Sequence, residues 1–67
     1  MTKTEAAKTI AIQVRVWARR TSQPITMTMV EEILSEFGGH RGDGLQIQTA
    51  ANLANRKTVL RLALEDF

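Results

Sequence analysis

Residues 10–17, IAIQVRVW, decide between two folds for this chain. Their alternating β-branched side chains favour a strand, which would place four of them on one side: Ile10, Ile12, Val14 and Val16. The flanking sequence favours a helix, because Thr2 and Glu5 have the spacing of a capping box and alanine is a strong helix former. We therefore expect a helix over residues 2–20 and keep a strand over about residues 9–17 as the alternative. A helix would gather one apolar stripe, made of Ala7, Ile10, Ala11, Val14, Trp17 and Ala18.

Two breaks divide the rest of the chain. Pro24 pushes the preceding residue out of the helical region, so the first segment ends before it. All four glycines lie within residues 38–44, and glycine is costly inside a helix or strand but well suited to a flexible connection. The remaining segments are residues 26–37 and 45–67.

The middle segment has the clearest helical pattern. Thr28 and Glu31 are spaced as a capping box, and Gly38 is well placed as the residue that follows the helix. The apolar residues recur at helical spacing and predict one buried stripe, made of Met29, Val30, Ile33, Leu34 and Phe37.

The last segment begins with the alternation of a short strand over residues 45–49. From Ala50 the pattern becomes helical, with Thr49 as the expected N-cap. Its main apolar stripe consists of Leu53, Leu60, Leu64 and Phe67. Val59 and Leu62 lie off this stripe, so the helix is apolar on two sides. We expect the excess apolar surface to form a dimer interface through Val59, Leu62 and Phe67.

These segments predict a mostly α, three-helix single domain over residues 1–67 that forms a homodimer. A domain of this size buries only about 60% of the surface of its unfolded chain, which makes a dimer a reasonable source of further stability. The expected core consists of Ile10, Val14, Trp17, Val30, Ile33, Leu34, Leu53, Leu60 and Leu64.

The composition argues against several functions. The chain has no cysteine and one histidine, His40 in the glycine-rich segment, so thiolate metal sites and most catalytic triads are excluded. No apolar run approaches the roughly 18 residues that a membrane span needs, and the N-terminus lacks the pattern of a signal peptide. We expect a cytoplasmic protein that is not an enzyme, with no metal, no cofactor and no membrane partner.

The charges are unevenly distributed along the chain. Residues 1–24 carry a net charge of +4, residues 25–39 carry −3, and residues 40–67 carry +1. Lys8, Arg15 and Arg19 would share one face of the first helix and could contact phosphates. The last segment carries a second basic cluster, formed by Arg56, Lys57 and Arg61. Asn52 and Asn55 lie nearby, and asparagine suits adenine edges.

The stretch of residues 55–62, NRKTVLRL, resembles the recognition helix of helix-turn-helix regulators, and residues 49–54 resemble the helix that precedes it. The strand alternative resembles ribbon-helix-helix repressors, in which a two-stranded ribbon of an intertwined dimer reads the major groove. That resemblance implies that Gln13, Arg15 and Trp17 would face the bases.

Two functions remain open from the sequence. One is a small DNA-binding transcriptional regulator, with DNA contacts through Arg56, Lys57, Arg61, Asn52, Asn55, Lys8, Arg15 and Arg19. The other is a protein-interaction module that binds a partner protein through apolar helix surfaces and inhibits or adapts it.

Overall fold

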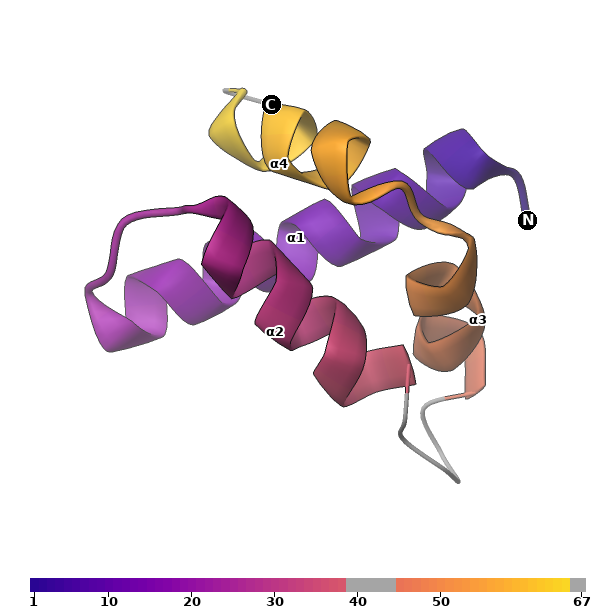
Figure 1. Ribbon diagram of the computed structural model, residues 1–67, viewed down its shortest axis with the longest axis horizontal. Helices are drawn as coiled ribbons and strands as arrows, with labels where there is room; N and C mark the ends of the chain where they lie inside the picture. The colour runs from indigo at the N-terminus through magenta and orange to yellow at the C-terminus, as the bar shows by residue number, and fades with distance from the viewer. Residues whose placement is uncertain (39–44, 66–67) are drawn as a thin grey trace.

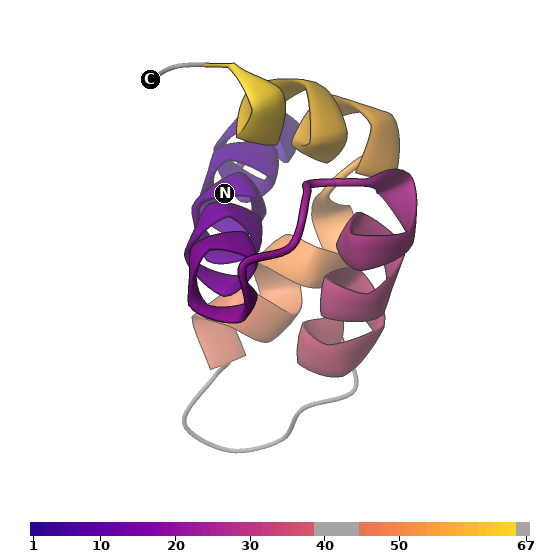
Figure 2. The ribbon, with the colours of Figure 1, turned by 90° about the vertical axis from the view of Figure 1, so that its left-hand side faces the viewer.

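A computed structural model of the chain describes residues 1–38 and 45–65, and all regular secondary structure within them is helical. The described residues form four helices: α1 (Lys3–Thr21), α2 (Met27–Gly38), α3 (Leu45–Leu53) and α4 (Arg56–Leu64). Helix α1 runs along the molecule and packs against the other three (Figures 1 and 2). The predicted mostly α fold is confirmed. The strand over residues 9–17 and the ribbon-helix-helix arrangement are wrong.

Local hydrogen bonds fix both ends of α1. The Thr2 hydroxyl accepts the Glu5 backbone N–H at 3.1 Å, so the predicted N-terminal cap is present. At the other end, Ser22 adopts a left-handed conformation with a φ of 54°. The backbone N–H of Gln23 then donates to the carbonyl of Ala18 at 3.0 Å. This bond satisfies a carbonyl of the last turn before Pro24 turns the chain toward α2.

Helix α2 begins slightly earlier than the sequence predicted. The Thr26 hydroxyl accepts the Met29 backbone N–H at 3.3 Å, and the Thr26 carbonyl accepts the N–H of Val30 at 3.1 Å. Thr28 therefore lies inside the helix, and the predicted capping box with Glu31 is wrong. Gly38, expected just beyond the helix, is its last residue.

The last segment forms two helices where one was expected. Residues 45–49 are helical rather than extended, and Thr49 lies inside α3 instead of capping a helix. The helix stops at Leu53. The side-chain oxygen of Asn55 then accepts the backbone N–H groups of Lys57 at 2.9 Å and Thr58 at 3.3 Å. The described chain therefore has four helices rather than three, because Asn55 starts a new one.

This break changes which side chains point inward. A continuous helix would have buried Leu53 and Leu64 on one stripe, but these are 37% and 62% exposed. In α4, Val59 is fully buried and Ala63 nearly so, while Leu60 is partly buried at the edge of the core. The predicted core positions Leu53 and Leu64 are wrong because the new helix begins with a different rotation about its axis.

The core forms around one face of α1. Ile10 and Val14 are fully buried there, as predicted, and they pack with Val30 and Ile33 of α2. Trp17 was also predicted to be buried, but it is 47% exposed. It lies at the margin of the α1 stripe, toward α2, where no described helix covers its outer side. Seven of the thirteen buried apolar residues in the described part of the chain are alanines: Ala6, Ala7, Ala11, Ala18, Ala50, Ala51 and Ala63.

The Asn55 cap predicts a clear difference between two asparagines. We expect Asn55→Ala to lower the free energy of unfolding by about 1 kcal/mol, because two backbone N–H groups lose their acceptor. The matched control is Asn52→Ala, which replaces an exposed asparagine within α3 and should leave stability nearly unchanged. Urea denaturation followed by circular dichroism measures both. Equal losses would contradict the assigned role of Asn55.

Candidate nucleic-acid interface

Three cations lie on one flank of α1. Lys8, Arg15 and Arg19 are spaced by seven and four residues, which places them on the same side of a helix. Lys8 and Arg19 are exposed, and Arg15 is partly buried. The guanidinium of Arg15 donates to the backbone carbonyl of Glu65 at 3.3 Å, just beyond α4. The basic flank of α1 is therefore the flank beside the C-terminal end of α4.

Helix α4 turns two of its cations away from the core. Val59 and Ala63 point inward, so Lys57 and Arg61, one turn apart, lie on the exposed side. Arg61 forms an ion pair with the Glu65 carboxylate at 3.3 Å. Arg15 and Arg61 thus contact the same residue from two different helices. We call the set Lys8, Arg15, Arg19, Lys57 and Arg61 the basic face.

Arg56 belongs to a different part of the surface. Its guanidinium forms an ion pair with the Glu31 carboxylate at 3.1 Å, which links the first turn of α4 to α2. Both side chains are more than half exposed. Arg56 was predicted to act with Lys57 and Arg61, but in the structure it points to the acidic helix.

The two asparagines predicted to contact bases have different settings. The side-chain oxygen of Asn55 is occupied as the cap of α4. Asn52 lies on α3 beside the end of α2. A Cβ added at Gly38, the last residue of α2, would be 3.3 Å from the side-chain oxygen of Asn52. The structure therefore does not place Asn52 among the cations of the basic face.

The pair α3 and α4 has the element order implied by the helix-turn-helix resemblance. Only Ala54 and Asn55 connect α3 to α4. In the described chain, both helices pack on α1 and α2, and they do not pack on each other. Helix-turn-helix motifs have a longer turn of three or four residues. The likeness in element order does not extend to this geometry.

The predicted dimer residues are only partly accessible. Val59 is fully buried within the single chain, because the break at Asn55 turns it toward α1, so it offers no surface to a second copy. Leu62 is partly buried against the same core. Phe67 lies outside the described residues.

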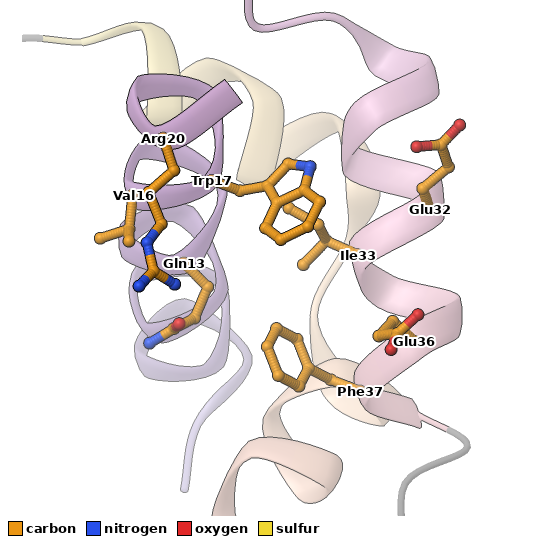
Figure 3. Close-up of a pocket in the computed structure, with 8 residues that line it drawn as sticks. All are labelled: Gln13, Val16, Trp17, Arg20, Glu32, Ile33, Glu36 and Phe37. Atoms are coloured by element: carbon orange, nitrogen blue, oxygen red, sulfur yellow. The ribbon is translucent and has the colours of Figure 1, made fainter. Parts of the chain in front are cut away.

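A groove between α1 and α2 was not predicted from the sequence. It has a volume of about 340 Å³, and Figure 3 shows its two walls. The α1 wall consists of Gln13, Val16, Trp17 and Arg20, and the α2 wall of Glu32, Ile33, Glu36 and Phe37. Both sets recur at helical spacing, which could have revealed the groove. The groove was not predicted because Trp17 was expected in the core and Phe37 in the buried stripe of the middle helix.

Other kinds of site find little support in the described residues. No three of their carboxylate side chains come together as metal ligands. None of their helices combines the length and apolar character needed to cross a bilayer. His40 lies outside the described residues.

The chain matches no protein-family model, no curated protein and no solved structure.

The Arg56–Glu31 ion pair should contribute little to stability, because exposed pairs are worth about 0–1 kcal/mol. We expect a double-mutant cycle with Arg56→Ala and Glu31→Ala to give a coupling free energy below about 1 kcal/mol. Urea denaturation of the four proteins measures it. A coupling of several kcal/mol would show that Arg56 is held firmly against α2.

Proposed function

We propose that this protein is a small DNA-binding regulator of transcription, which binds the duplex through the basic face of α1 and α4. The observation that supports the proposal is the contact of Arg15 and Arg61 with the same residue, Glu65. One cation from each of two basic clusters that are far apart in the sequence thereby contacts the same residue. Phosphates of one duplex segment could then be reached from both helices.

The ion pair of Arg61 does not oppose this role. An exposed pair such as Arg61–Glu65 is worth about 1 kcal/mol at most, so a phosphate can replace the carboxylate at little cost. Among the described residues, Lys8, Arg19 and Lys57 add exposed charges to the same face. The acidic residues Glu32 and Glu36 belong to α2 and line the groove beside the other flank of α1.

The proposed contacts are mainly to the DNA backbone. Lysine and arginine side chains on a convex helical surface suit phosphates, whereas base reading needs side chains that enter a groove. Asn55 is engaged as a cap, and Asn52 lies elsewhere on α3. We therefore expect affinity to depend strongly on salt and weakly on sequence.

Binding of an acidic partner protein is a second candidate function. It is favoured by two apolar side chains on or beside the basic face: Ile12, 49% exposed, and Leu64, 62% exposed. The variant Ile12→Ser separates the two functions. It should weaken docking to a protein but leave binding to phosphates almost unchanged.

Binding to a random-sequence duplex should fall steeply as salt rises. If all five cations contact phosphates, the plot of log K against log salt concentration has a slope of about −4.5. Fluorescence anisotropy with a duplex of about ten base pairs, roughly one helical turn, measures this slope for one binding site. Absence of binding at about 50 mM salt with micromolar protein would contradict the proposal.

Two neighbouring arginines of α1 provide a matched comparison. Arg19 belongs to the basic face, whereas Arg20 lines the groove on the other flank, and both are exposed. We expect Arg19→Ala to weaken binding and to make the salt slope shallower by about one unit. Arg20→Ala removes the same charge and should have a much smaller effect. Equal effects would mean that net charge, and not the basic face, governs binding.

A further inference from the structure

The groove between α1 and α2 leaves aromatic and aliphatic surface uncovered. Trp17 and Val16 are each 47% exposed, and Ile33 and Phe37 line the opposite wall. Large apolar side chains gain stability when covered, at about 25 cal/mol for each Å² removed from water. Tryptophan is also enriched among the central interface residues that carry most of the binding energy.

The two walls of the groove carry different charges. Arg20 and Gln13 lie on the α1 wall, and Glu32 and Glu36 on the α2 wall (Figure 3). Within the described chain, the structure shows no ion pair between Arg20 and either glutamate. The groove therefore has an apolar floor, a positive wall and a negative wall, and these charges remain available to a partner.

Such a surface is complementary to itself. A second copy can be placed on the first by a rotation of 180° about an axis that lies in the interface and runs along the groove. This rotation exchanges the two walls, so the positive wall of one copy faces the negative wall of the other. An interface with this symmetry uses the same patch on both copies. Arg20 of each chain would lie opposite Glu32 and Glu36 of the second chain, with Trp17 from both chains covering the apolar floor.

We propose that this groove is the interface between two copies of the chain in a symmetric homodimer. A nucleic acid would be repelled by Glu32 and Glu36, and a partner of uniform charge would be attracted to only one wall. A second copy places an opposite charge against each wall.

The size of the molecule is compatible with this assembly. A stable interface buries at least about 600 Å² on each partner. That area is about an eighth of the 4716 Å² of accessible surface of the described chain. The groove flank of α1 is opposite its basic flank, so the dimer leaves both basic faces accessible.

Trp17 provides a direct measurement because it is the only tryptophan of the sequence. We expect sedimentation equilibrium to show a dimer and the Trp17 emission to shift to the red on dilution, as the indole becomes exposed to water. A chain that remains monomeric up to about 1 mM, with emission independent of concentration, would overturn the proposal.

Charge reversal tests the orientation of the two copies. Arg20→Glu places like charges opposite each other at two symmetric positions, so the dimer dissociation constant should rise at least about tenfold. The double variant Glu32→Arg/Glu36→Arg should weaken its own dimer in the same way. Mixing the two variants should restore association as a heterodimer, because each wall then faces its opposite charge.

Arg19→Glu is the matched control, since it makes the same charge change on the other flank of α1. Its dissociation constant should stay within about twofold of that of the original chain, because the residue lies outside the interface. A loss as large as that of Arg20→Glu, or a mixture that fails to associate, would overturn the proposed arrangement. Circular dichroism of each variant establishes that its helices are intact.

Discussion

Two hydrogen bonds to the side-chain oxygen of Asn55 set the orientation of α4. By accepting the N–H groups of Lys57 and Thr58, Asn55 starts a new helix two residues after α3 ends. The rotation of that helix brings Val59 and Ala63 into the core and turns Lys57 and Arg61 outward. The contribution of α4 to the core, its part of the basic face and its contact with α2 therefore depend on where this cap starts the helix.

The sequence predicted most of the first two helices because their patterns are local. Thr2 caps α1 as expected, and Ile10, Val14, Val30 and Ile33 are buried. Residues 10–17 are helical despite their β-branched composition. They lie within a long amphipathic helix whose apolar side packs against the three other helices.

The last segment was harder to predict because periodicity alone does not reveal a short break. Leu53, Leu60 and Leu64 fit one continuous stripe, and nothing in that pattern shows that Asn55 interrupts it. The basic clusters could be found from the sequence, but their meeting at Glu65 could not, because it depends on how α4 crosses α1. The groove also depends on packing, because it forms where α2 leaves Trp17 uncovered.

The abundance of alanine in the core restricts how this protein can change over evolution. Alanine has no side-chain volume to lose except by becoming glycine, so at Ala7 and Ala11 nearly every substitution adds atoms to fully buried positions. Larger residues could be accepted there only together with smaller ones on the facing helices. Divergence at the core should therefore proceed through paired replacements, whereas the outward positions of the same helix can vary independently.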